Sequence, residues 1–130
     1  MTHIDELATI GTSTWLDDLS RERLDSGNLR ELLSTKSIVG VTTNPAIFAA
    51  AMSSGTSYDE DIAILREKGA HADEAVYSLA VEDVRNACDV FTEIFEQTDG
   101  RDGRVSIEVD PRISADAEAT LSQARELWAQ

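Results

Sequence analysis

The chain has 130 residues, of which 42% are hydrophobic and 28% are charged, and its formal net charge is −14. This balance is typical of one soluble globular domain, and the negative charge argues against nucleic acid or an anionic membrane as a partner. No apolar stretch is long enough to span a membrane, and the N-terminal residues lack the pattern of a secretory signal. We therefore expect a cytoplasmic protein.

Three short strands are predicted, each followed by helical sequence. The first lies around residues 13–17 and precedes two helical segments, residues 20–24 and 29–33. The second spans residues 37–43 and leads to a helix near residues 45–52, with Pro45 in the first turn, where a missing N–H is tolerated. Residues 53–56 end that helix. Ser57 and Glu60 then fit a capping box that opens a helix reaching about residue 67.

The segment over residues 72–97 has apolar side chains at spacings of three and four, which predicts one helix with a buried face. This face consists of Val76, Ala80, Val84, Ala87, Phe91 and Ile94, and Phe95 widens it. The single cysteine, Cys88, cannot form an intrachain disulfide and is expected to pack as a small buried hydrophobic residue. His3 and His71 lie in polar surroundings and are expected at the surface.

A turn with two glycines, residues 98–103, leads to a third strand over residues 104–110. In the helix after it, Ser114 is the expected N-cap and Asp116 lies in the first turn. The apolar stripe of this last helix consists of Ala117, Leu121, Ala124 and Trp128. Strands that alternate with helices predict an α/β fold with a parallel sheet. Because three parallel strands leave two open edges, we expect the chain to begin a larger architecture.

The third strand places a carboxylate in an unusual position. Side chains two residues apart share a face of a strand, so Ser106, Glu108 and Asp110 lie opposite the apolar set Val105, Ile107 and Val109. In a β/α barrel the apolar set faces the helices and the other set faces the interior. A carboxyl group of Glu108 in that interior is desolvated unless it is paired, which raises its pKa and suits it to proton transfer.

The same alternation puts Thr42 and Asn44 together with Gly40 on the second strand, and Asp17 with Trp15 on the first. Asp17, Asn44 and Glu108 therefore occupy the carboxyl ends of successive parallel strands. In β/α barrels the active site is built at that end.

Structural explanations compete with this one. Asp17 and Asp18 are also suited to cap the next helix, and the Thr-Asn-Pro sequence is also typical of a turn with an Asx hydrogen bond. Glu108 would equally serve as the partner of an arginine. A divalent metal held by Asp17, Asp18, Glu108 and Asp110 lacks support from any ligand spacing, so no metal is predicted.

The sequence resembles the transaldolases, specifically the longer bacterial type. The matching stretches are STWLDDLS, GVTTNPAIF, YDEDI, LAVEDVRNACDVF, GRDGRVSIEVDPR and ARELW, which follow the family's order and cover essentially the whole chain. The resemblance implies a (β/α)₈ TIM barrel, of which residues 1–130 would supply the first three β/α units, with helical insertions after the second strand. It also implies an enzyme without a cofactor that transfers a dihydroxyacetone unit between sugar phosphates of the pentose phosphate pathway.

The resemblance carries roles to three residues. A lysine forms a Schiff base with the ketose, Asp17 handles the proton on the hydroxyl beside the breaking carbon–carbon bond, and Glu108 acts through a water in forming and resolving the carbinolamine. Asn44 hydrogen-bonds the dihydroxyacetone unit. We also expect Thr42 to reach the substrate from the end of its strand. The implied substrates are sedoheptulose 7-phosphate, fructose 6-phosphate, erythrose 4-phosphate and glyceraldehyde 3-phosphate.

One departure limits the expectation. The family's lysine lies on a fourth strand, in a run such as Ile-Lys-Ile-Pro, which this chain does not contain. Lys36 and Lys68 are not at the carboxyl end of a predicted strand, so the chain alone is expected to be inactive. The phosphate-binding arginines would also come later, which accounts for the acidic charge here. Two other hypotheses remain open: a free-standing acidic α/β interaction module, and a transaldolase fused to a phosphoglucose isomerase.

Overall fold

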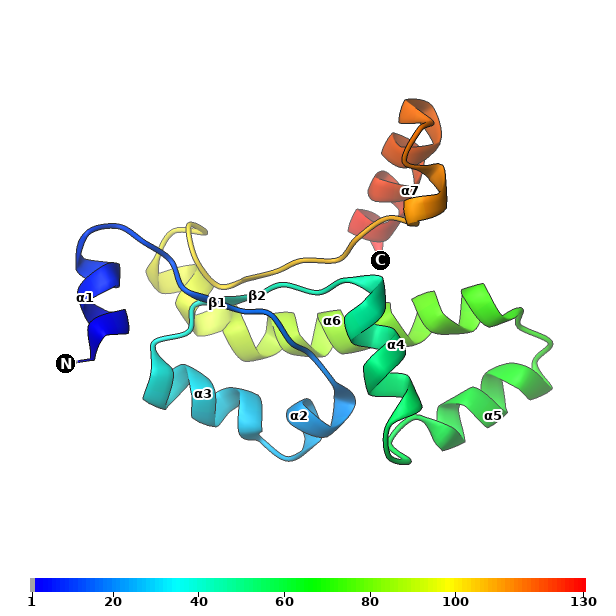
Figure 1. The fold of residues 1–130 in the computed structure, drawn as a ribbon, viewed down its shortest axis with the longest axis horizontal. Helices are drawn as coiled ribbons and strands as arrows, with labels where there is room; N and C mark the ends of the chain where they lie inside the picture. The colour runs from blue at the N-terminus through cyan, green and yellow to red at the C-terminus, as the bar shows by residue number, and fades with distance from the viewer. Residues whose placement is uncertain (1) are drawn as a thin grey trace.

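The computed structural model describes residues 2–130, and its centre is a parallel three-stranded sheet in the order β1-β2-β3 (Figure 1). The strands are β1 (Trp15–Leu16), β2 (Gly40–Val41) and β3 (Arg104–Val105). Trp15 is paired with Gly40, and Gly40 with Arg104. The predicted parallel α/β sheet is confirmed, and within residues 2–130 it does not close into a barrel.

The paired strands are shorter than predicted. Only two residues of each strand pair, although single hydrogen bonds continue the ladder, from Thr42 N to Leu16 O at 2.8 Å and from Ser106 N to Val41 O at 2.9 Å. The reason lies in β2, whose chain enters a helix at Pro45. Beyond Ser106 the chain that follows β3 therefore has no strand beside it within residues 2–130.

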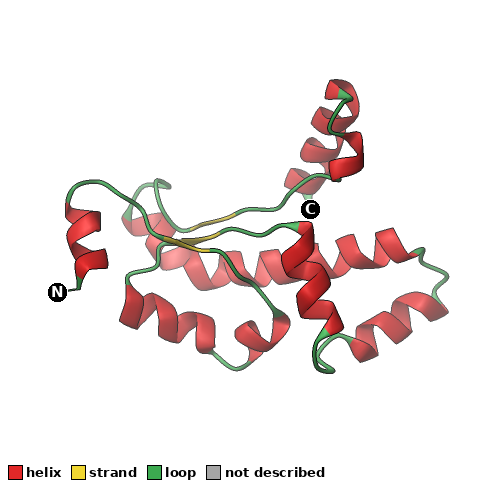
Figure 2. Cartoon of the chain, viewed as in Figure 1, coloured by secondary structure: helices red, strands yellow, loops and turns green. Residues whose placement is uncertain are grey.

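Seven α-helices and one short 3₁₀ helix accompany the strands among residues 2–130 (Figure 2). They are α1 (His3–Thr9), α2 (Arg21–Asp25), α3 (Asn28–Lys36), α4 (Pro45–Ser53), α5 (Asp59–Glu67), α6 (Ala72–Gln97), η1 (Pro111–Ile113) and α7 (Ala117–Ala129). Helix α1 was not predicted, although its capping box of Thr2 and Asp5 is visible in the sequence. No helix in the described part of the chain is long and apolar enough to cross a membrane.

The core lies between the sheet and helices α2, α3 and α6, which occupy one side of the strands in Figure 1. Buried members are Leu19, Leu29, Ile38, Val41, Phe48, Ala80, Val84, Ala87 and Phe91. Val105 and Ile107 pack against this cluster, as the alternation along the third strand predicted. The opposite set of strand side chains is therefore directed away from the helices.

Two predicted helix caps are wrong. Helix α5 begins after Tyr58, and no side chain caps it, so the predicted Ser57–Glu60 box does not form. The Tyr58 hydroxyl donates instead to the buried Asp83. Helix α7 is capped by Asp116, whose side chain accepts from Ala119 N at 2.9 Å. Ser114 instead ends η1, a turn that the sequence did not predict.

The predicted apolar faces of α6 and α7 differ in how far they are buried. On α6 the central members of the face are buried, but Val76 and Phe95, near its two ends, are exposed. Cys88 is also exposed, contrary to prediction, because it lies one position beyond Ala87 and so on the outer side of the helix. On α7 all four members of the predicted stripe are exposed. His3 and His71 are exposed, as predicted.

Candidate active site

Asp17 and Thr42 meet at the carboxyl end of β1 and β2. The hydroxyl Oγ1 of Thr42 donates to Oδ1 of Asp17 at 2.7 Å. The backbone bond from Thr42 N to Leu16 O continues the ladder beneath this contact. The two residues predicted to share the carboxyl edge of the sheet are thus in direct contact.

The two neighbouring aspartates have separate contacts. Asp18 forms an ion pair with Arg23, whereas Asp17 has no ion-pair partner within residues 2–130 and its side chain is exposed. Neither caps the following helix, because Ser20 is the N-cap of α2 and accepts from Arg23 N at 3.2 Å. The capping explanation of Asp17 and Asp18 is therefore wrong, and the Asp17 carboxylate remains accessible.

Asn44 has a structural role that leaves half of its amide available. Its Oδ1 accepts from Ile47 N at 2.9 Å and caps α4, so the Asx hydrogen bond considered as the alternative is present. Since the oxygen is occupied, the Nδ2 donors are the atoms left for a ligand. Asn44 also lines a groove of about 480 Å³ together with Asp18, Ser20 and Ile47.

Thr43 and Ser106 join the ends of β2 and β3, a contact that the sequence did not predict. Thr43 N donates to Ser106 Oγ at 2.9 Å, and Thr43 Oγ1 donates to Ser106 O at 2.7 Å. Thr43 is buried, so both of its polar groups depend on these bonds. They hold the segment carrying Asn44 beside the segment carrying Glu108.

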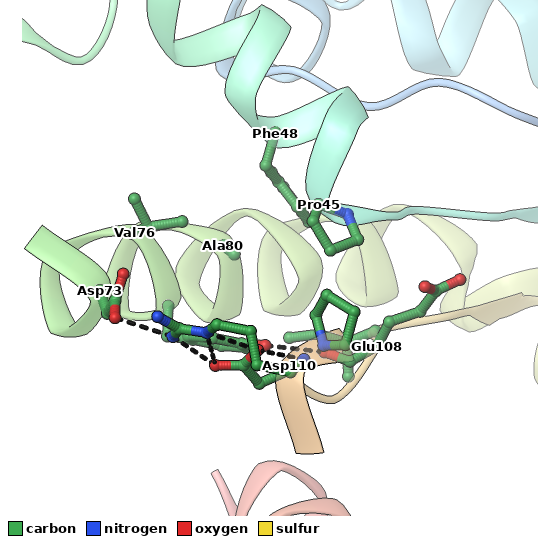
Figure 3. A pocket seen from close by; sticks show the side chains of 11 residues that line it. Pro45, Phe48, Asp73, Val76, Ala80, Glu108 and Asp110 are labelled. Atoms are coloured by element: carbon green, nitrogen blue, oxygen red, sulfur yellow. Dashed lines mark hydrogen bonds and ion pairs between the residues drawn. The ribbon is translucent and has the colours of Figure 1, made fainter. Parts of the chain in front are cut away.

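Glu108 differs from its prediction in one respect. Its side chain is exposed in this chain rather than enclosed, and no ion pair to an arginine forms among the described residues. The expected desolvation is absent because nothing in residues 2–130 covers that side of the sheet. Figure 3 shows the Glu108 side chain extending away from Asp73 and Asp110.

The arginine near Glu108 binds Asp110 instead. Arg112 Nε donates to Oδ1 of Asp110 at 2.9 Å, and Arg112 Nη2 donates to Asp73 on α6 at 2.7 Å. The side-chain and backbone hydrogen bonds that Arg112 donates to Asp110 hold the pKa of Asp110 below its usual range. The cluster borders an apolar cavity of about 230 Å³ beneath Pro45, Phe48 and Val76 (Figure 3). Asp110 therefore caps η1 and forms an ion pair with Arg112.

Comparisons with known proteins agree on one family. Residues 14–130 match the family described as Transaldolase/Fructose-6-phosphate aldolase. The chain belongs to this family. It is 57% identical over 122 residues to the transaldolases of Mycolicibacterium paratuberculosis and Mycobacterium tuberculosis, and 55% identical to that of Mycolicibacterium smegmatis. These alignments cover 94% of this chain but 33% of each relative, so the chain spans about a third of their length.

The two lysines of this transaldolase-family chain lie away from the site. Lys36 is the last residue of α3, before β2 begins, and Lys68 is the C-cap of α5. Both are exposed and neither follows the carboxyl end of a strand. Within residues 2–130 no group of three or more His, Cys, Asp or Glu side chains is arranged to hold a metal ion.

The structure also contains a buried polar cluster that the sequence did not predict. Arg21, Tyr58 and Asp83 come from α2, the start of α5 and α6, and all three are buried. Burial raises the pKa of Asp83 and of Tyr58 above their ordinary values. Asp83 stands three residues after Ala80 and four before Ala87, and this place on the apolar face of α6 was the available signal.

Proposed function

We propose that this chain is the N-terminal part of a transaldolase, and that it forms the first three β/α units of a (β/α)₈ barrel domain. Family membership supports the proposal, and so does the parallel sheet with three chemically suited side chains at its carboxyl end. The observation that carries it is the hydrogen bond between Thr42 and Asp17 at that edge. A complete barrel needs about 250 residues, which agrees with the longer relatives.

In this proposal, Asp17 takes the proton from the substrate hydroxyl while the adjacent carbon–carbon bond breaks, and the bond electrons pass to the Schiff base of a lysine outside this chain. Thr42 donates to Asp17 and so keeps the carboxylate oriented. Asn44 contributes its Nδ2 donors to the dihydroxyacetone unit. Glu108 acts through water on the carbinolamine once the rest of the barrel covers it.

The substrates that follow are the sugar phosphates sedoheptulose 7-phosphate, fructose 6-phosphate, erythrose 4-phosphate and glyceraldehyde 3-phosphate. They belong to the pentose phosphate pathway, and a cytoplasmic location fits that role. The cationic groups that bind their phosphates would come from outside this chain, whose own net charge is −14. No cofactor is needed, because the iminium group itself accepts the electron pair.

The assay for the proposal uses the protein extended to the full length of its relatives. With fructose 6-phosphate and erythrose 4-phosphate it should form glyceraldehyde 3-phosphate, and omitting the acceptor should abolish turnover. Turnover without the acceptor would instead indicate the aldolase activity named in the family description. The 130-residue chain alone should be inactive, and robust turnover by it would contradict the assignment of the lysine.

Two variants test the site residues. Asn44→Asp preserves the oxygen that caps α4 but removes the amide donors, so the loss of borohydride-trapped ketose adduct reports binding rather than helix stability. Glu108→Ala should slow formation of the same adduct. Rates within roughly twofold of the parent for both variants would mean that these roles are wrongly assigned.

A further inference from the structure

The buried cluster of Arg21, Tyr58 and Asp83 includes the first residue after the loop that carries Asp17. This loop, residues 17–20, connects β1 to α2. At its start the Asp17 side chain accepts from Thr42, and inside it Leu19 is fully buried in the core. At its end comes Arg21, the first residue of α2. Both ends of a four-residue loop are thereby anchored.

The anchor at Arg21 begins with the backbone. The first N–H groups of a helix have no partner within the helix. Arg21 N donates to the hydroxyl of Tyr58 at 2.8 Å, and that hydroxyl donates to Oδ2 of Asp83 at 2.6 Å. The Tyr58 oxygen therefore bridges the start of α2 to a fully buried carboxylate on α6.

The Arg21 side chain closes the same cluster. Its Nε donates to Oδ1 of Asp83 at 2.9 Å, and its guanidinium lies 4.9 Å from the centre of the Tyr58 ring. Glu82, at 3.2 Å, and Asp61 bind the remaining end of the guanidinium. Buried polar groups that are fully paired hold one arrangement, because any displacement leaves a charge without its partner.

We propose that Arg21, Tyr58 and Asp83 are positioning residues for Asp17. They hold the N-terminus of α2 at one place and so set the path of the loop that presents the Asp17 carboxylate. The inference rests on the proposed function, in which Asp17 accepts a proton during carbon–carbon cleavage. None of the three cluster residues contacts substrate in this scheme.

The positioning role predicts which step of the reaction becomes slower when the cluster is disrupted. A displaced Asp17 still allows the ketose to bind and to form its Schiff base, since those steps depend on Asn44, Glu108 and the lysine. Cleavage slows because proton transfer requires the carboxylate at hydrogen-bond distance from the hydroxyl. Small errors in position lower such a rate strongly.

The test uses Tyr58→Phe in the full-length protein, which removes one oxygen and keeps the ring. We expect kcat to fall about tenfold, with KM for fructose 6-phosphate and the rate of borohydride trapping nearly unchanged. Asp83→Asn keeps the shape of the carboxylate and should have the same signature. Unchanged kcat in both variants, or a parallel loss of trapping, would overturn the inference.

A matched control separates positioning from stability. Val90→Ala removes packing from α6 two turns beyond Asp83, where Val90 lies against the core. It should lower the melting temperature without changing kcat below the transition. An equal loss of kcat in Val90→Ala would show that general loosening explains the effect, and the inference would be wrong.

A double-mutant cycle gives the decisive measurement. If Tyr58 acts through Asp17, then Tyr58→Phe should change kcat by less than roughly twofold in an Asp17→Asn background. A full loss in that background would mean that the cluster acts elsewhere. The activity of the full-length parent separates the proposed function from the positioning role. An inactive full-length protein refutes the proposed function. An active protein in which the Tyr58 and Asp17 variants have additive effects refutes only the positioning role.

Discussion

Helices α6 and α7 have similar sequence patterns and opposite surroundings. Both carry apolar side chains at helical spacing, and the sequence predicted an apolar stripe on each. Phe91 on α6 is completely buried, whereas Trp128 on α7 is 87% exposed. Figure 1 shows α6 lying along the strands, while α7 projects away from them.

The difference has a physical origin in the sheet. Helix α6 has three strands to pack against, including β3, to which it is joined by a tight turn. Helix α7 follows β3, and no further strand lies beside β3 within residues 2–130. Periodicity thus predicts a helix and its apolar face, but burial of that face depends on a partner. Exposed aromatic and aliphatic side chains in such a stripe are typical of an interface.

The largest expected effect separates the two helices directly. Phe91→Ala should destabilise the chain by about 3–5 kcal/mol because it leaves a cavity in a packed core. Trp128→Ala should change the free energy of unfolding by less than about 0.5 kcal/mol, since its side chain is already in solvent. Urea denaturation followed by circular dichroism measures both.

The same two variants extend the comparison of α6 and α7 to the full-length protein. If additional barrel units cover α7, then Trp128→Ala should there cost several kcal/mol, about as much as Phe91→Ala. A neutral Trp128→Ala in the longer protein would mean that α7 stays uncovered. The barrel proposal for this part of the chain would then need revision.

The second prediction concerns the turn that joins α6 to β3. Gly103 has φ of +76°, and a Cβ atom there would lie 2.5 Å from the backbone nitrogen of Phe95. Gly103→Ala should therefore cost about 2–3 kcal/mol, combining backbone strain with a steric clash. The measurement is again urea denaturation.

Gly55→Ala is the matched control for that variant. Gly55 has a similar φ of +72°, but a Cβ atom there would meet nothing within 4 Å. Only the backbone strain remains, so the loss should be about 1 kcal/mol. Equal losses in the two variants would mean that the close approach of β3 to α6 contributes nothing.

Alternation along the strands predicted much of the candidate site. It placed Asp17 and Thr42 on one edge, and their side chains are in hydrogen-bond contact. It also predicted that Val105 and Ile107 face the helices. These predictions worked because strand geometry is local and has a strict period of two. The catalytic roles of Asp17, Asn44 and Glu108 remain predictions.

The rest depended on contacts between distant segments. The bond between Arg21 and Asp83 joins residues 62 positions apart, and no local pattern specifies that pairing. Glu108 is exposed and not enclosed, and the α7 stripe is exposed too, because burial requires a covering element that a local sequence pattern does not specify. Cap predictions failed where tertiary contacts outweighed a local motif, as at Tyr58.

The smallest predicted effect contrasts two carboxylates, one from each region. Hydrogen bonds from Arg112 lower the pKa of Asp110 near α7, whereas burial on α6 raises the pKa of Asp83. Carbon-13 NMR titration should therefore show Asp110 ionising below the ordinary value of about 3.9 and Asp83 above it. Asp83 ionising below Asp110 would contradict the contrast.

The two shifts change stability in opposite directions. The contribution of Asp110 is complete above its unfolded pKa and is lost as the pH falls through its lower folded pKa. The contribution of Asp83 is complete below its unfolded pKa and is lost as the pH rises through its higher folded pKa. Arg112→Ala should return the pKa of Asp110 towards the ordinary value and leave the pKa of Asp83 unchanged. The Arg112 ion pairs lie at the exposed end of α6, whereas Asp83 is paired with Arg21 in a buried cluster. A joint shift of both pKa values would mean that the two regions are electrostatically coupled.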